Sequence, residues 1–207
     1  NNLIYLNTVG GQDEIVFDGN SFLLNRDGSV KNICKSFSEE VFSFSIDKKE
    51  FCKTNKETKD NNIYKKDEYE DLYEALKIGT YDYISKSNLN GVLLGLSGGI
   101  DSAVTSSLCA RTNIKTIVVS MPIRQDNIQH NLSLEHIDWL KSKYKNITDY
   151  TINLDDVFKS FQGTMSAFKS ELAFANSRSR LRMVTLYQIA QSSNALVVGT
   201  GNKVEDF

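Results

Sequence analysis

Short apolar segments alternate with segments of helical periodicity through the second half of the chain, and this alternation constrains the fold most. Four apolar runs of strand length occupy residues 91–96, 117–119, 150–152 and 195–199. Helical spacing is expected over 67–86, from near Ser102, over 132–144 and over roughly 171–192. Strands that alternate with helices of this length usually lie parallel, because each helix returns the chain to the same edge of the sheet. The sequence therefore predicts an α/β fold with a doubly wound, mostly parallel sheet.

The first part of the chain has a pattern typical of β structure. Residues 1–45 contain short apolar runs separated by turn signals such as Arg26-Asp27-Gly28-Ser29, and we also expect a turn at Val9-Gly10-Gly11. Residues 46–66 are dense in Lys, Asp, Glu and Asn and have too little apolar surface to pack. We therefore predict a β-rich part over 1–45, a linker over 46–66 and the α/β part over 67–207.

Charge balance and cysteine content narrow the class of protein. The chain has 24 Lys and Arg residues against 26 Asp and Glu, a formal net charge of −2, which argues against an extended nucleic-acid footprint. No apolar run reaches the roughly 18 residues of a membrane span, and residues 1–10 lack the pattern of a secretory signal. Cys34, Cys52 and Cys109 form neither a disulfide framework nor paired metal-ligand spacing. We therefore expect a cytoplasmic protein that binds neither nucleic acid nor membrane. Because the chain lacks an initial Met and ends in an apolar strand pattern, we also expect it to be a fragment.

The segment Ser97-Gly98-Gly99-Ile100-Asp101-Ser102 lies directly between the strand 91–96 and the following helix. Its glycines let the backbone approach a phosphate closely and place N–H groups at a helix N-terminus, where an anion is favoured. Ser97 and Ser102 would add hydroxyl donors, and Asp101 would hold a Mg²⁺ that bridges phosphate oxygens. No Lys-Ser/Thr pair follows the glycines, so this is not the Walker loop. The alternative is a glycine turn in which Ser102 or Asp101 caps the helix.

This loop matches the Ser-Gly-Gly-x-Asp-Ser loop of the ATP pyrophosphatases, and later segments resemble the NAD synthetases within that group. Asn176-Ser177-Arg178-Ser179-Arg180-Leu181-Arg182-Met183 is similar to their Asn-x-x-Ala-Arg-x-Arg-Met segment, with Ser179 at the usual Ala and Ala175 at the common Glu. Gly199-Thr200-Gly201-Asn202-Lys203-Val204-Glu205 is similar to their Gly-Thr-Gly-Asn-Lys-x-Glu signature. Met121-Pro122 matches the Met-Pro where the chain passes the adenine, but Arg124-Gln125-Asp126-Asn127 departs from the family's Tyr-Ser-Ser-like run. Read alone, the first segment could be a solvated basic helix and the second a Gly-rich turn with a capping Glu.

The first 30 residues resemble the last part of the nitrilase-like glutaminase domain of glutamine-dependent NAD synthetases. The resemblance rests on Asn7-Thr8-Val9-Gly10-Gly11-Gln12-Asp13-Glu14 and on Phe17-Asp18-Gly19-Asn20-Ser21. None of the three cysteines has the context of that domain's nucleophile, so we expect no glutaminase catalytic residue in this chain. His130 and His136 are predicted to be solvated helix residues rather than ligands.

The resemblance implies an adenine nucleotide alpha hydrolase-like fold and assigns roles to particular residues. Contacts to ATP and pyrophosphate would come from Ser97, Gly98, Gly99, Asp101, Ser102, Met121 and Thr200. Contacts to deamido-NAD would come from Asn176, Arg180 and Arg182, and Asp101 and Glu205 would hold Mg²⁺. On a helix Asn176 and Arg180 share a face, whereas Arg182 points about 160° away from Arg180.

The implied reaction is the ATP-dependent amidation of deamido-NAD to NAD through an adenylated intermediate. Ammonia would come from glutamine, AMP and pyrophosphate would be released, and the protein would form a homodimer or a larger homo-oligomer. Residues 1–45 would then end a nitrilase-like glutaminase domain, and 67–207 would be a C-terminally incomplete NAD synthetase domain. Two alternatives stay open. One is another ATP pyrophosphatase, such as a GMP synthetase or a tRNA-modifying adenylating enzyme; the other is a non-catalytic module that senses ATP.

Overall fold

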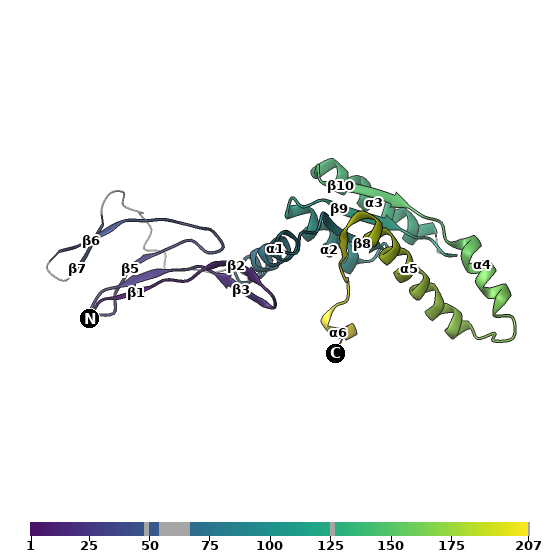
Figure 1. Cartoon of the computed structure of the whole chain (residues 1–207), viewed down its shortest axis with the longest axis horizontal. Coiled ribbons are helices and arrows are strands. Elements are labelled where there is room, and N and C mark those ends of the chain that lie inside the picture. Colours follow the sequence, from purple (N-terminus) through teal and green to yellow (C-terminus); the bar gives the residue numbers. More distant parts are fainter. Residues whose placement is uncertain (48–49, 54–66, 125–126, 207) are drawn as a thin grey trace. The chain divides into compact units, whose positions relative to one another are not determined.

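The computed structural model describes residues 1–47, 50–53, 67–124 and 127–206 (Figure 1). The chain divides into two compact units, Asn1–Tyr83 and Ile84–Phe207, and the helix α1 (Glu68–Lys86) crosses this division. None of the described helices combines the length and the apolar character that a membrane span requires.

The first unit is built from short antiparallel strands. They are β1 (Leu3–Tyr5), β2 (Val9–Gln12), β3 (Ile15–Asp18), β4 (Phe22–Leu24), β5 (Val30–Ile33), β6 (Phe44–Asp47) and β7 (Glu50–Lys53). β1, β4 and β5 form one sheet, and β2–β3 and β6–β7 form separate hairpins. The turn predicted at Arg26–Ser29 joins β4 to β5, and Gly28 has a φ of +85° there.

Two expectations for this unit were wrong in detail. Val9, Gly10 and Gly11 belong to β2, and the turn falls on Asp13 and Glu14 instead. The start of the predicted linker contains part of the β6–β7 hairpin, in which the side chain of Phe51 is buried. A single aromatic residue thus anchors a segment that composition alone would leave unfolded. Residues 54–66 of the predicted linker lie outside the described residues.

The second unit contains a four-stranded parallel sheet in the order β10-β9-β8-β11. Its strands are β8 (Gly91–Leu96), β9 (Thr116–Ser120), β10 (Ile147–Thr151) and β11 (Ala195–Val197). The chain moves outward from β8 to β10 and then returns to pair β11 with the other side of β8. This confirms the predicted doubly wound parallel sheet, and it places the switch in strand order beside β8, where such folds bind ligands at the carboxyl ends of the strands.

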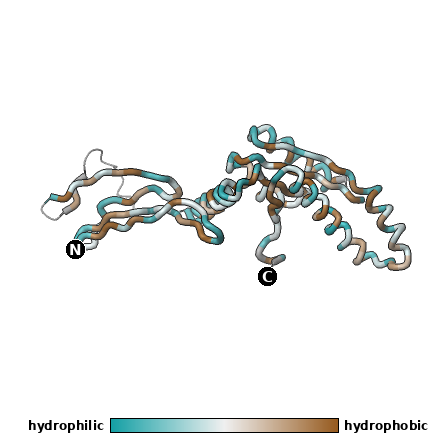
Figure 2. The backbone as a smooth tube through the Cα atoms, viewed as in Figure 1, coloured by the Kyte–Doolittle hydropathy of each residue, from teal (hydrophilic) through white to brown (hydrophobic). Residues whose placement is uncertain are grey.

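Helices cover both faces of this sheet. They are α2 (Ile100–Arg111), α3 (Asn127–Lys143), α4 (Asp155–Thr164) and α5 (Glu171–Ser193). The short helix α6 (Lys203–Asp206) follows β11 on a segment that extends away from the sheet. Leu94 and Leu96 pack with α2 and α3, whereas Leu93 packs on the opposite face with α4 and α5. This alternation follows from the two-residue period of a strand. Hydrophilic and hydrophobic residues are intermixed along α5 (Figure 2), and several of its apolar residues, among them Met183, Val184 and Tyr187, are exposed.

The predicted helices and strands of this unit are confirmed, with shifted ends. α3 begins at Asn127 rather than near 132, and β11 stops at Val197 rather than 199. α4 was not predicted. It is a short helix behind an Asx-type turn, in which the Asn153 side-chain oxygen accepts a hydrogen bond from the backbone N–H of Asp155 at 2.8 Å.

Candidate active site

The loop after β8 is held in a closed turn by its own serines. The Ser102 hydroxyl donates to the Gly99 carbonyl at 3.0 Å and accepts from the Ser97 backbone N–H at 3.3 Å. The Gly99 N–H in turn donates to the Ser97 side-chain oxygen at 3.2 Å. Ser102 is buried, and α2 starts with Gly99 as its N-cap without a side-chain cap. The buried Ser102 side chain therefore stabilises the turn. Neither Ser102 nor Asp101 is the N-cap of α2, in contrast to the alternative of a glycine turn capped by one of them.

Gly98 is the residue that the loop geometry requires most strictly. Its φ is +83°, a left-handed value that disfavours residues with a side chain. A Cβ atom at this position would lie 2.3 Å from the backbone oxygen of Gln129 in the first turn of α3. The loop thus packs directly against α3, and only glycine allows that approach.

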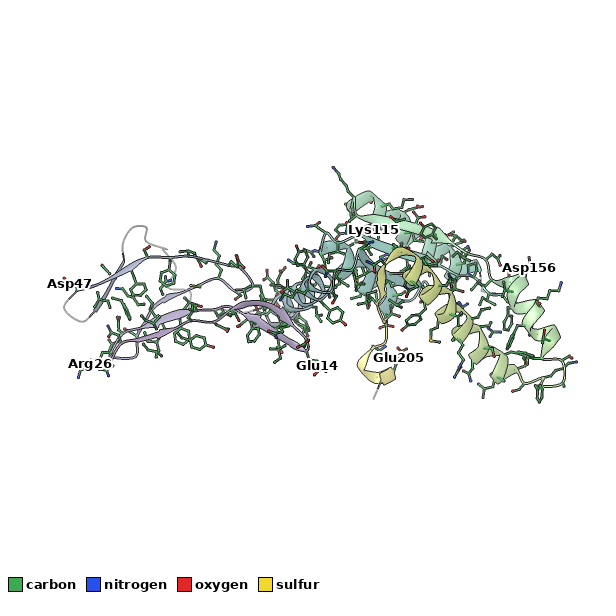
Figure 3. The ribbon with its side chains drawn as sticks, viewed as in Figure 1. Glu14, Arg26, Asp47, Lys115, Asp156 and Glu205 are labelled. Carbon is green, nitrogen blue, oxygen red and sulfur yellow. The ribbon has the colours of Figure 1, made fainter. Side chains whose placement is uncertain are left out.

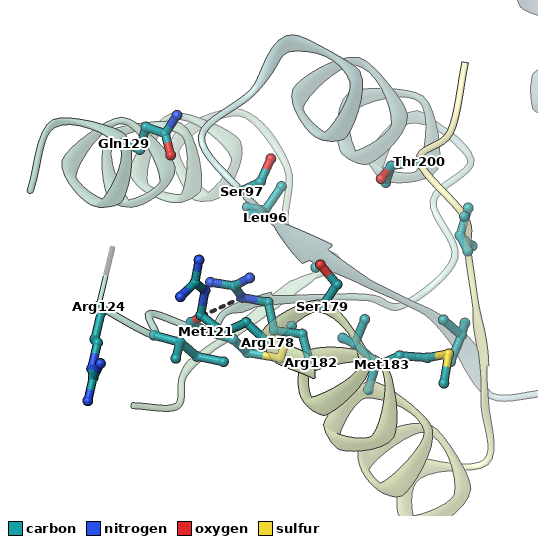
Figure 4. A pocket seen from close by; sticks show the side chains of 16 residues that line it. Leu96, Ser97, Met121, Arg124, Gln129, Arg178, Ser179, Arg182, Met183 and Thr200 are labelled. Atoms are coloured by element: carbon teal, nitrogen blue, oxygen red, sulfur yellow. Dashed lines mark hydrogen bonds between the residues drawn. The ribbon is translucent and has the colours of Figure 1, made fainter. Parts of the chain in front are cut away.

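A pocket of about 550 Å³ opens at the carboxyl ends of β8, β9 and β11 (Figure 4). Among the predicted site residues, Ser97, Met121, Thr200 and Arg182 line it. A second pocket of about 310 Å³ lies on the α3 side of the loop and is lined by Gly98, Gly99 and Ser102. The loop therefore borders both pockets, and most of the residues predicted to contact ATP gather here.

Three arginines line the larger pocket. Arg182 is half-buried, and its Nε donates a hydrogen bond of 2.9 Å to the Met121 carbonyl. Desolvation lowers the pKa of its guanidinium, and the positive charge of Arg178 lowers that pKa further. The guanidinium carbons of Arg178 and Arg124 lie 5.8 Å and 5.7 Å from the centre of the Phe158 ring. Sequence analysis assigned a role to Arg182 but missed Arg178, although the four-residue spacing between them indicates a shared helix face.

The two carboxylates predicted to hold a metal are joined through Asn202. The Asn202 side-chain amide donates to Asp101 Oδ1 at 3.3 Å, and its backbone N–H donates to Glu205 Oε2 at 3.4 Å. Asn202 also uses its side-chain oxygen to accept the N–H of Val204 at 2.9 Å, at the start of α6. Figure 3 labels Glu205 in this segment. The family signature contains this asparagine, but sequence analysis gave it no role.

Comparison with known proteins shows to which family the chain belongs. A family model described as NAD synthase matches residues 72–207, more than half of the chain. The chain belongs to the NAD synthase family. This confirms the resemblance drawn from the motifs in the α/β part.

Individual members of the NAD synthase family match over most of this chain. The glutamine-dependent NAD(+) synthetase of Acinetobacter baylyi is 33% identical over 98% of this chain, which spans 37% of that protein. The structure of a glutamine-dependent NAD+ synthetase from Acinetobacter baumannii in complex with ADP has a TM-score of 0.85 and 28% identity, covering 99% of this chain and 38% of that one. The structure of an NMN synthetase from Francisella tularensis has a TM-score of 0.59 and 33% identity, over 64% and 54% of the two chains. This chain therefore spans little more than a third of the glutamine-dependent relatives.

Two residues that the NAD synthase motif singles out lie outside both pockets. Asn176 and Arg180 are exposed, and Arg180 Nη1 donates to the Asn176 carbonyl at 3.2 Å. They share a face, as predicted, while Arg182 on another side of α5 enters the larger pocket. Their assignment to deamido-NAD stays a prediction.

The histidines were expected to be solvated, and that expectation was wrong. His136 is half-buried, its Nε2 lies 2.9 Å from the hydroxyl of buried Ser106, and its ring stacks on Trp139 with centroids 5.5 Å apart. Burial lowers the pKa of His136, and a hydrogen bond to the Ala103 carbonyl partly opposes this shift. His130 is also half-buried, with Nδ1 3.4 Å from the Ser120 hydroxyl. Serines on α2 and β9 thus draw in side chains that a helical pattern places outside.

The described cysteine side chains are poor nucleophiles. Cys34 and Cys109 are buried. Burial raises the pKa of both thiols, to about 11 for Cys109, and a thiol rather than a thiolate does not attack a carbonyl carbon. Cys52 lies in β7, and its side chain is outside the described set. The absence of a glutaminase nucleophile stays a prediction.

Proposed function

We propose that this protein amidates deamido-NAD to NAD, consuming ATP and releasing AMP and pyrophosphate, with ammonia derived from glutamine. One observation carries the proposal. Asn202 joins the loop after β8 to the loop after β11 at the carboxyl edge of the sheet, so the two family motifs meet at one place beside a cationic pocket. Membership of the NAD synthase family and the glutamine-dependent relatives support the same activity.

The arrangement of donors supports a position for ATP. The phosphates would lie on the turn formed by Ser97, Gly98 and Gly99, which leads into the N-terminus of α2, where an anion is favoured. The nucleoside would enter the larger pocket, between Met121 on one strand end and Thr200 on another. The Acinetobacter baumannii relative was solved with ADP, which agrees with a nucleotide in this fold.

The carboxylates suit a hard cation such as Mg²⁺. Asp101 and Glu205 supply carboxylate oxygens, which are the ligands that Mg²⁺ prefers, and both are held by Asn202. The described residues contain no group of three or more His, Cys, Asp or Glu that could hold a metal. Two protein carboxylates with substrate phosphates are the usual pattern for Mg²⁺ in phosphate chemistry, so the set fits the ion. When bound, it would supply neutralisation of phosphate charge.

The reaction needs no protein nucleophile. An oxygen of the nicotinate carboxylate attacks the α-phosphorus of ATP, the bond to the β-phosphate oxygen breaks, and pyrophosphate leaves. Ammonia then attacks the carboxyl carbon, loses a proton and expels AMP. The chain contributes alignment of two anionic substrates and donors aimed at their phosphates, which are strong sources of catalysis when groups are preorganised.

The proposal also assigns roles to exposed residues of α5. Asn176 and Arg180 would contact deamido-NAD from the exposed face of α5. Exposed apolar residues on the same helix, among them Val184 and Tyr187, favour a homodimer or larger homo-oligomer. We also place the enzyme in the cytoplasm, where its nucleotide substrates occur.

A product assay separates this function from its rivals. Pyrophosphate release by the full-length protein should depend on deamido-NAD and should be negligible with xanthylate, the substrate of a GMP synthetase. Nicotinate mononucleotide should be tested as a third substrate, because the structure is also similar to that of an NMN synthetase. Nucleotide binding without pyrophosphate release in any arm would identify a non-catalytic module instead.

A further inference from the structure

The three arginines of the larger pocket form an uncompensated cluster of positive charge. Arg178 and Arg182 lie four residues apart on α5 and enter the pocket from the same side, while Ser97 enters from the end of β8 (Figure 4). Arg124 lines the pocket from the segment after β9. In the part of the chain that the structure describes, no carboxylate forms an ion pair with any of the three guanidiniums.

The cluster is held in place by contacts that leave its charge unneutralised. Arg182 uses Nε to donate to the Met121 carbonyl, so its remaining N–H groups are available to a ligand. Arg178 and Arg124 both lie over the ring of Phe158, which is fully buried. Cation–π contacts of this kind orient a guanidinium but do not cancel its charge.

The backbone at Arg124 is also fixed in an unusual conformation. Its φ of +45° is in the left-handed region, which is unfavourable for a residue with a side chain. Its N–H donates at 2.7 Å to Asp155 Oδ1, so this carboxylate hydrogen-bonds to the Arg124 backbone. Residues held in such conformations by their surroundings often serve a ligand.

Like charges gathered in a half-buried pocket disfavour the ligand-free state. Burial, and after it repulsion from the charge of Arg178, lowers the pKa of Arg182. An anion between the two guanidiniums would relieve this repulsion. A single carboxylate carries one negative charge and would leave an excess, whereas a phosphate group carries up to two and accepts several N–H donors at once.

We propose that Arg178 and Arg182, with Arg124 at the rim, form a subsite for a phosphate-type dianion, separate from the loop that begins at Ser97. The pocket would then hold two phosphate groups, one on the loop and one on α5. The dianion on α5 could be a terminal phosphate of the adenine nucleotide or the whole diphosphate bridge of the second substrate, which carries two negative charges, and this part of the inference rests on the proposed function. The expected affinity of the subsite for a simple phosphate anion does not rest on the proposed function.

The first experiment maps the subsite without any substitution. The full-length protein is treated with phenylglyoxal, which modifies guanidiniums, with and without inorganic pyrophosphate, and each arginine is followed by mass spectrometry. Arg178 should be modified several-fold more slowly when pyrophosphate is present. Arg111, at the other end of α2 from the loop, is the matched control and should react equally in both samples. Equal modification of Arg178 in both samples would overturn the proposal.

The second experiment measures the contribution of the charge. Calorimetric titration with inorganic pyrophosphate should show about tenfold weaker binding for Arg178→Gln, which corresponds to the loss of one charged hydrogen-bonding group. Arg111→Gln should bind as the parent does. Without ligand, the melting temperature of Arg178→Gln should stay equal or rise, because repulsion is removed. If Arg178→Gln does not fold, the pyrophosphate affinity of Arg124→Gln, a substitution in a different segment, tests the same subsite. Parent-like affinity in the folded variants would contradict the subsite.

Titrations with ADP and with deamido-NAD identify the source of the phosphate. Weakening of ADP alone by Arg178→Gln assigns the subsite to the nucleotide, and weakening of deamido-NAD alone assigns it to the second substrate. If Arg178→Gln weakens the binding of neither ADP nor deamido-NAD, the subsite has no role in binding substrate. Because pyrophosphate binding is read without turnover, a protein that fails to make NAD would refute the proposed function and leave the subsite standing.

Discussion

The side-chain amide of Asn202 donates a hydrogen bond of 3.3 Å to Asp101, 101 positions earlier in the chain. This contact joins the segment after the first strand of the sheet to the segment after the last, at the point where the strand order switches. The backbone N–H of Asn202 meanwhile reaches Glu205. One neutral residue therefore contacts both carboxylates without neutralising either.

Asp101→Asn tests the role of that charge. Asparagine retains an oxygen that can accept from Asn202, so the contact between the loops should survive and the melting temperature should change little. Pyrophosphate release should fall at least about a hundredfold, because a charge that holds Mg²⁺ is lost. Turnover near that of the parent would remove Asp101 from the metal site.

Gly98→Ala tests the fit of the loop against α3. The added Cβ would meet the Gln129 backbone oxygen at 2.3 Å in a left-handed conformation, so unfolding should become easier by on the order of 1–3 kcal/mol. Nucleotide affinity should also fall, since the loop has to move. Gly163→Ala is the matched control: this glycine lies within α4 with nothing near its Cβ position, and alanine there should stabilise by about 0.5–1 kcal/mol. Denaturant unfolding of both variants measures the difference, and equal effects would show that the packing against Gln129 is unimportant.

Arg180→Lys tests the exposed face of α5. Lysine keeps the charge but lacks the planar fork, so binding of deamido-NAD should weaken by about 1.5–3 kcal/mol while ATP binding stays nearly constant. Separate titrations with the two substrates provide the measurement. Equal losses for both substrates would mean that Arg180 acts on the structure of the helix and does not read the dinucleotide.

His136 predicts a pH dependence of stability. Burial lowers its pKa in the folded protein below the ordinary value of 6.5, so the unfolded chain binds more protons between those two values. The free energy of unfolding should therefore fall as the pH drops below 6.5 toward the lowered pKa. His136→Gln keeps a donor for Ser106 but cannot titrate, and its stability should fall less over the same range. Identical pH profiles for the two proteins would rule out this histidine as the cause.

The sequence alone was enough to predict the parallel sheet and the two loops that meet at its edge. Strand 91–96 was located to the residue, because an apolar run bounded by Asn90 and Ser97 has clear ends. The site was harder to assign within α5. Motif matching singled out Arg180 and Arg182, but the pocket is lined by Arg178 and Arg182, because the angle at which a helix packs decides which of its faces lines a pocket.

What could not be predicted depends on contacts between distant segments. The partners of His136 and His130 lie on other elements, and no local pattern shows that Ser106 and Ser120 are placed to bind them. The β6–β7 hairpin depends on burying Phe51 within a charged stretch, an isolated signal that composition averages away. In both cases tertiary packing outweighs local polarity.

Adenylation of a substrate carboxylate at this site can be followed with an oxygen label. Deamido-NAD labelled with ¹⁸O in its nicotinate carboxylate is incubated with the full-length protein, ATP, Mg²⁺ and ammonium or glutamine. We expect NAD together with AMP that carries one ¹⁸O atom, because the attacking carboxylate oxygen leaves with AMP. Formation of ADP and phosphate, or of AMP without the label, would contradict it.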